Sequence, residues 1–190
     1  MKRLTLVIFT FALFLVGCGG NIDYNMSKQV KDFEFTTQDN DKLSLQDLNG
    51  EWWVADFVFT NCITVCPPMT SNMAKLQTKM EDEKLDAQLV SFTVDPEFDT
   101  PEVLKEYAKS YEVDLGNWTF LTGYDYDTIE ELSIKSFGSV VAPPPTGSDQ
   151  VIHGTSFFLV SPEGKAVKSY SGVDAEEVDL IISDLKKVLN

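Results

Sequence analysis

The 190-residue sequence is poor in residues on which many protein functions depend. It contains three cysteines and one histidine, and its 15 lysines and arginines are outnumbered by 30 aspartates and glutamates. Three cysteines are too few for a disulfide-rich scaffold. One histidine excludes every metal site that needs two, such as the two-histidine helix of metalloproteases. The acidic excess leaves no basic surface for a phosphate backbone, so we expect no nucleic-acid partner.

The N-terminal segment has the composition of a secretory signal. A basic head at residues 1–3 precedes an apolar run over residues 4–16, which is shorter than the roughly 20 residues that span a bilayer. The run ends in Leu15-Val16-Gly17-Cys18, which resembles the bacterial lipobox. We therefore predict a signal peptide over residues 1–17 and lipidation of Cys18, for example with palmitate. Two or more acyl chains would anchor the chain to the extracytoplasmic face of the cell membrane. The alternative is an ordinary signal peptide in which Cys18 has no role.

The remaining chain is long enough for one domain and shows no internal repeat. Residues 18–31 are polar and lack a clear period, and we interpret them as a tether between the membrane and the domain. The folded domain is predicted over residues 32–190.

Within this domain, apolar stretches that suit strands alternate with stretches of helical periodicity. Strands are expected over residues 33–35, 43–45, 52–59, 89–94, 118–121, 157–160 and 166–170, and helices over 69–83, 100–111, from 127 onward and 175–189. Asp127-Thr128-Ile129-Glu130 has the pattern of a capping box. This order predicts an α/β fold with a central mixed sheet, parallel at its centre and antiparallel at its edge, flanking helices and an N-terminal β-hairpin.

Two cysteines follow the predicted central strand and precede a helix. Cys62 and Cys66 thus lie where ligand sites form in open α/β sheets, at the carboxyl end of a strand. On a helical turn, their i, i+4 spacing would place both sulfurs on one face, where they can close a disulfide or hold one metal ion. The helix N-terminus is expected to lower their thiol pKa values. The alternative is a stabilising disulfide, which is weak because so short a loop restricts the unfolded chain little.

His153 is the only imidazole, and it shortly precedes the predicted strand 157–160. Taken alone, a single histidine is more often a surface or core residue than a ligand. If its strand lies beside strand 52–59, however, His153 meets Cys62 and Cys66 at one edge of the sheet. Two thiolates and one imidazole suit a soft metal, above all Cu(I), and Cu(II) could add an oxygen ligand. Zinc usually wants a fourth ligand, and the sequence offers no obvious one.

Three segments carry a family resemblance, in order along the chain. They are Phe59-Thr60-Asn61-Cys62-Ile63-Thr64-Val65-Cys66-Pro67, Ser91-Phe92-Thr93-Val94-Asp95-Pro96-Glu97 and Ile152-His153-Gly154-Thr155-Ser156-Phe157-Phe158-Leu159-Val160-Ser161-Pro162-Glu163-Gly164. Together they resemble the Sco/SenC family of copper-binding, thioredoxin-like proteins, from about residue 30 to the C-terminus. One departure is Ile63, where many members have proline, and we expect it to change loop stiffness without removing metal binding.

The resemblance implies a thioredoxin-like fold and a membrane-tethered protein that assists assembly of the binuclear copper centre in cytochrome c oxidase subunit II. Such a protein acts as copper donor, as thiol-disulfide reductant of that centre, or both, so its status as an enzyme stays open. Carried over by position, Cys62, Cys66 and His153 would be the copper ligands, and the two cysteines would be the redox-active pair. We also expect a monomer.

Other polar and sulfur-containing residues allow two interpretations each. Asp95 ends a predicted buried strand at the same edge of the sheet. It could orient a ligand or contact Cu(II), or it could cap the turn before Pro96. Met69 and Met73 could supply thioether ligands, but their spacing fits the core face of a helix, which is our prediction.

Two other functions fit part of the sequence. An extracytoplasmic thiol-disulfide oxidoreductase would use the Cys62/Cys66 pair without a required metal. Thioredoxin-type sites, however, use CxxC with a cis-proline before the facing strand, whereas this chain has CxxxC and Gly154-Thr155-Ser156. A thiol peroxidase would need an arginine near its cysteines to activate thiolate and peroxide, and none lies near these two.

Overall fold

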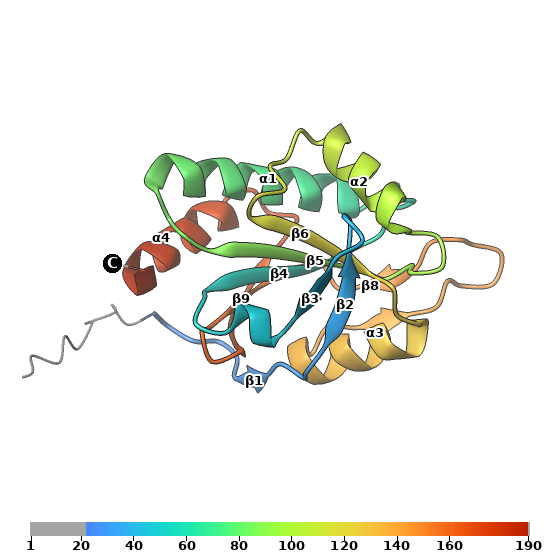
Figure 1. Ribbon diagram of the computed structural model, residues 1–190, viewed down its shortest axis with the longest axis horizontal. Helices are drawn as coiled ribbons and strands as arrows, with labels where there is room; N and C mark the ends of the chain where they lie inside the picture. Colours follow the sequence, from blue (N-terminus) through green and yellow to red (C-terminus); the bar gives the residue numbers. More distant parts are fainter. Residues whose placement is uncertain (1–21, 190) are drawn as a thin grey trace, which may run out of the picture.

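The computed structural model describes residues 22–189 of the chain (Figure 1). The predicted signal peptide and Cys18 lie outside this part. The strands are β1 Lys28–Gln29, β2 Glu34–Thr37, β3 Lys42–Ser44, β4 Trp53–Val58, β5 Gln88–Thr93, β6 Trp118–Thr122, β7 Val141–Ala142, β8 Ile152–His153, β9 Ser156–Val160 and β10 Lys165–Ser171. The helices are α1 Cys66–Glu83, α2 Pro101–Ser110, α3 Tyr126–Leu132 and α4 Glu177–Leu189, with a 3₁₀ turn η1 Gln46–Leu48 and a π-helical turn η2 Ser133–Phe137.

Eight strands form one sheet in the order β1-β10-β9-β4-β5-β6-β2-β3, and β7 and β8 form a separate two-stranded sheet. β4, β5 and β6 are parallel neighbours, whereas β9, β10 and β2 pair antiparallel. The predicted α/β fold, with a mixed sheet and an N-terminal β2–β3 hairpin, is therefore confirmed.

The central strand β4 is buried on both faces, which explains its almost unbroken apolar run. Trp53, Ala55 and Phe57 belong to the core that includes α3, while Val54 and Val58 belong to the core under α1, α2 and α4. Figure 1 shows the same arrangement, with α1, α2 and α4 on one side of the sheet and α3 on the other. This two-sided burial fixes the strand whose end carries the cysteines.

Helix α1 begins at Cys66, three residues earlier than the apolar period indicates. Pro67 and Pro68 fit this first turn, because the amides there have no partner within the helix. The apolar side chains at helical spacing are fully buried: Met69, Met73, Leu76 and Met80. The prediction that Met69 and Met73 are core residues, rather than metal ligands, is confirmed.

The predicted capping box of α3 is wrong by two residues. The N-cap is Asp125, whose extended backbone precedes the helix and whose carboxylate accepts a hydrogen bond from the amide of Thr128 (2.9 Å). Asp127 lies within the first turn instead. Two aspartates lie near the start of this helix, and either could be the N-cap by sequence. Only the backbone conformation shows which of them is.

The interpretation of residues 18–31 as a tether is wrong for its described part. Ile22 and Val30 are buried, and β1 pairs with β10. The side chain of Asn25 donates to the carbonyl of Ser169 (2.9 Å) and accepts from its amide (2.8 Å). The segment docks through isolated contacts, so it shows no period in the sequence, and the folded domain begins near residue 22 rather than 32.

The topology brings three chain segments to one edge of the sheet. The carboxyl ends of β4 and β5 lie there because these strands are parallel. The start of β9 lies there too, because β9 runs antiparallel to β4. No helix within residues 22–189 is long and apolar enough to cross a membrane.

Candidate metal centre

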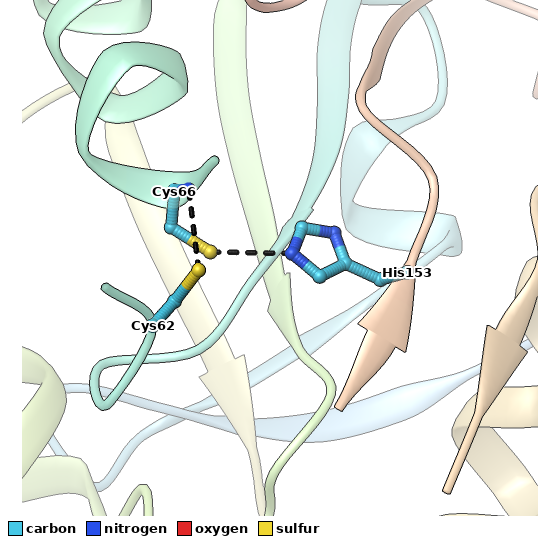
Figure 2. A group of neighbouring side chains, drawn as sticks. All are labelled: Cys62, Cys66 and His153. Atoms are coloured by element: carbon cyan, nitrogen blue, oxygen red, sulfur yellow. Dashed lines mark hydrogen bonds between the residues drawn. The ribbon is translucent and has the colours of Figure 1, made fainter. Parts of the chain in front are cut away.

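Three side chains of the kind that bind soft or borderline metals meet at this edge of the sheet (Figure 2). Cys62 lies in the turn after β4, Cys66 is the first residue of α1, and His153 ends β8. The two sulfurs and a ring nitrogen all lie within 4.8 Å of one another. Within residues 22–189 this is the only such group of histidine, cysteine and acidic side chains. The structure thus brings together the three residues that the sequence analysis selected.

The segment between β4 and α1, residues 59–65, is called the cysteine turn here. It places the sulfur of Cys62 at the start of α1. The amide of Cys62 donates to the carbonyl of Phe59 (3.3 Å), and the amide of Cys66 donates to the sulfur of Cys62 (3.3 Å). The i, i+4 spacing suggested that both cysteines lie on a helical turn. Cys62 instead lies before the helix. Its sulfur takes the position of an N-cap acceptor, where the helix dipole favours negative charge. Both cysteines are free thiols.

The ring of His153 is oriented by its own backbone and by an aromatic neighbour. Nδ1 lies 2.9 Å from the carbonyl oxygen of Gly154, and because a carbonyl only accepts, Nδ1 must be the donor. Nε2 then faces the thiols, 3.2 Å from the sulfur of Cys66. Phe59 packs edge-on against the ring at 5.7 Å. Nε2 can share a proton with the thiols or offer its lone pair to a metal.

The two thiols have opposite acidities. Burial works against the Cys62 thiolate, but hydrogen bonds from His153, from the Cys66 thiol and from the amides of Thr64 and Cys66 outweigh it and lower the pKa of Cys62 to about 6. For Cys66, burial raises the pKa far above its usual value, and the neighbouring sulfur of Cys62 adds to the rise. The expected lowering of the thiol pKa therefore holds for Cys62 and is wrong for Cys66, because burial dominates at Cys66 whereas hydrogen bonds outweigh burial at Cys62.

Hydrogen bonds join the cysteine turn to the proline-rich loop, residues 142–149, and to Gln150, which lead to His153. Asn61 Nδ2 donates to the carboxylate of Asp149 (3.0 Å). Gln150 accepts from the amide of Ile63 (3.3 Å) and donates to the carbonyl of Asn61 (3.1 Å). Two segments nearly 90 residues apart are thus held together beside the ligands.

Asp99 is a positioning residue that the sequence analysis did not identify. It is fully buried, and its carboxylate accepts hydrogen bonds from the amide (3.2 Å) and hydroxyl of Thr60 and from the hydroxyl of Thr93. Burial raises the pKa of Asp99, and the donors from Thr60 and Thr93 oppose this rise. These bonds, the Asp99 clamp, connect the end of β5 to the turn two residues before Cys62.

Asp56 is a second buried carboxyl that the sequence shows only as a break in an apolar run. One oxygen accepts from the hydroxyl of Ser91 (2.6 Å), which in turn accepts from Trp118 Nε1 (2.9 Å). The other oxygen has no hydrogen-bond partner among the described residues. Burial raises the pKa of Asp56 to about 7, against the lowering effects of Ser91 and of His153.

Asp95 lies in the loop after β5, outside the three-ligand group. Within residues 22–189 no hydrogen bond joins its carboxyl to Cys62, Cys66 or His153. Burial raises its pKa; the amide of Phe98 opposes this rise, and nearby carboxylates add to it. A role for Asp95 in orienting a ligand stays a prediction.

The pKa of Cys62 gives a first test. Only thiolate is alkylated, so in the reduced, metal-free chain the rate of Cys62 modification by iodoacetamide should rise with pH and reach half its maximum near pH 6. His153→Ala removes the hydrogen bond with the imidazole that helps to lower the pKa of Cys62, and should move this midpoint upward by about one pH unit. Cys66, whose raised pKa keeps it protonated, serves as internal control in peptide mass spectrometry. A wild-type midpoint near the ordinary cysteine value of about 8.5 would contradict the arrangement.

The Asp99 clamp gives a second test. Asp99→Asn keeps the side-chain shape but cannot accept all three hydrogen bonds, so the turn should open more often and amide hydrogen exchange over residues 60–64 should quicken about tenfold. Asp184→Asn is the matched control, since Asp184 is also buried and accepts from Lys168, Lys187 and Tyr170 on another part of the fold. Equal acceleration in both variants would reduce the effect to a general loss of stability.

The structure is similar to solved structures of Sco proteins. A crystal structure of a SCO1/SenC family lipoprotein from Bacillus anthracis matches with a TM-score of 0.83 and 46% identity, over 88% of this chain and 99% of that one. BsSco, described as a member of the Sco family of cytochrome c oxidase assembly proteins, matches with a TM-score of 0.80 and 47% identity, over 89% and 99%. Arabidopsis thaliana ScoI, crystallised with copper bound, matches with a TM-score of 0.70 and 26% identity, over 83% and 98%.

The likeness therefore extends over the whole described domain and confirms the thioredoxin-like fold. The sequence profile of the SCO1/SenC family matches residues 23–190, which includes the cysteine turn and the histidine strand. The chain belongs to the SCO1/SenC family.

Proposed function

We propose that the chain binds one copper ion through Cys62, Cys66 and His153 and assists assembly of the binuclear copper centre of cytochrome c oxidase subunit II. The observation that carries the proposal is the gathering of two sulfurs and an imidazole nitrogen within 4.8 Å. Membership of a family with copper-bound and oxidase-assembly members supports it. We infer that the protein acts as a monomer.

The donor set fits copper better than other common metals. Two cysteine sulfurs and one imidazole form the three-coordinate set that suits Cu(I), and Cu(II) would add an oxygen ligand. The Cys62 thiolate is available at neutral pH, whereas the raised pKa of Cys66 means that copper must displace its proton. Copper affinity should therefore rise with pH.

Copper titration of the reduced chain tests the site. One equivalent of Cu(II) should produce a thiolate-to-copper charge-transfer band, and His153→Ala should weaken binding by at least about 100-fold, since even groups outside the ligand set change affinity by about 10–100-fold. Asp95→Asn, measured in parallel, tests the open role of that carboxyl. A wild-type chain without the band, or an unchanged band in His153→Ala, would remove the three-ligand site.

The role in assembly is tested with the acceptor. Reduced, metal-free chain is mixed with an oxidised peptide that carries the copper-site cysteines of subunit II. The Cys62 thiolate attacks the peptide disulfide, the Cys66 sulfur resolves the mixed disulfide, and the chain ends with a disulfide while the peptide gains two thiols. Reduction should occur at neutral pH and be lost in Cys62→Ser. No reduction by wild type would leave copper delivery as the function.

A thiol-disulfide oxidoreductase without a required metal is the second candidate. The contrast between an acidic Cys62 and a protonated, more deeply buried Cys66 favours it, because such a pair has one attacking and one resolving thiol. Reduction of unrelated disulfide peptides as fast as the subunit II peptide would favour this function over a dedicated assembly factor.

We also propose that the chain is a lipoprotein on the extracytoplasmic face of the cell membrane. The lipobox-like sequence before Cys18 supports this, as does the similarity to a Bacillus anthracis lipoprotein. Mass spectrometry of chain extracted from membranes is the test: residues 1–17 should be absent and Cys18 should carry lipid.

A further inference from the structure

Four exposed apolar side chains lie on the chain segments next to the candidate metal centre. The exposed fractions are 78% for Ile63, 53% for Phe98, 59% for Val140 and 48% for Ile152. They are half of the eight large apolar residues exposed within residues 22–189. Apolar side chains gathered in this way around a site are typical of a surface that docks a partner.

Each of these side chains comes from a segment that is hydrogen-bonded to, or directly adjoins, a segment carrying one of the candidate ligands. The amide of Ile63 is hydrogen-bonded to the loop that leads to Ile152. The carbonyl of Val140 accepts from the amide of Gly154, next to the metal-ligating histidine (2.9 Å). Phe98 directly precedes the aspartate of the Asp99 clamp, which holds the cysteine turn. We call these four side chains, together with the exposed carboxylates of Glu97 and Asp149, the docking surface.

The segments that form the docking surface carry carboxylates and no lysine or arginine of their own. Residues 51–74, 85–104 and 136–164, which include all its loops, contain no lysine or arginine. Lys28 lies beside Gly138, at a groove on which Val140 and His153 also lie. Charge complementarity therefore favours a partner with basic residues.

A groove beside the cysteine turn has the shape and chemistry for such residues. It has a volume of about 350 Å³, and its lining includes Pro143 and Pro144 and the carboxyls of Asp95, Glu97 and Asp149. The stem of a lysine or arginine could lie along the apolar wall while its charge meets the carboxylates. A cation would also relieve the repulsion that helps to raise the pKa of Asp95.

We propose that the docking surface binds the copper-accepting protein, and that this partner presents an apolar patch surrounded by lysines or arginines. The inference rests on the proposed function. A lipid bilayer is the less suitable occupant, because anionic headgroups would repel this acidic surface. In Figure 1 the first described residues and β8 also lie toward opposite ends of the long axis, so a chain anchored at Cys18 would present the surface away from the membrane.

The test compares an acceptor that needs docking with one that does not. Copper-loaded full chain in non-ionic detergent is mixed with the metal-free, reduced copper domain of subunit II, or with a small Cu(I) chelator. Phe98→Ser and Val140→Ser should each slow transfer to the domain about tenfold and leave transfer to the chelator unchanged.

Glu97→Lys should slow association of the chain with the domain and reduce the dependence of the association rate on salt. The matched controls are Leu180→Ser, an exposed apolar residue of α4, and Asp86→Lys, an exposed acidic residue before β5 at the opposite sheet edge; both should behave as wild type.

Titration of the same domain with metal-free chain measures binding without copper transfer. It therefore tests the docking surface separately from copper delivery. If wild type binds the domain but transfers no copper, delivery fails while docking is supported by weaker binding of Phe98→Ser. Three results would overturn docking: wild-type affinity in both serine variants, equal slowing in the controls, or equal slowing with the chelator. Protection of residues 94–100 from hydrogen exchange by anionic vesicles, and not by the domain, would assign the surface to lipid instead.

Discussion

The antiparallel pairing of β9 with β4 is the constraint that brings the residues of the candidate metal centre together. Since the two strands run in opposite directions, the start of β9 lies at the end of β4, and His153 comes to Cys66 across 87 residues of sequence. β4 is buried on both faces, so a shift of one residue would exchange the side chains of two filled cores. The ligands are therefore positioned by the two hydrophobic cores, through a strand that cannot slide.

Local electrostatics then make two identical side chains different. The sulfur of Cys62 accepts the first helical amide and lies at the positive end of α1, whereas Cys66 is enclosed in the core. One thiol is thereby ready to attack or to bind a metal near neutral pH, and its partner keeps a proton until a metal or a disulfide replaces it. Both proposed chemistries, copper binding and disulfide exchange, would use this difference between the two thiols.

Around the candidate ligands, some residues hold the cysteine turn in place, and other residues are exposed to solvent. Buried Asp99 and the side chain of Gln150 hold the cysteine turn from two sides. Outside them, apolar and acidic side chains face solvent at the end of the sheet. Such a surface costs solubility locally, but the large acidic excess of the chain compensates for it. Fixed candidate ligands beside exposed apolar and acidic side chains fit the proposed transfer of copper to one kind of partner.

The sequence by itself determined the mixed α/β fold, the core role of Met69 and Met73, and the selection of Cys62, Cys66 and His153, because periodicity and rare residue types are local properties. It misplaced the cap of α3 and the start of the domain, where isolated contacts leave no period. Asp99 and Asp56 could not be selected from the sequence, since acidic residues are abundant in it. Only their burial in the folded structure distinguishes these two from the others. The opposite acidities of the cysteines were also decided by tertiary structure, because solvation and hydrogen-bond donors depend on neighbours that are distant in the chain.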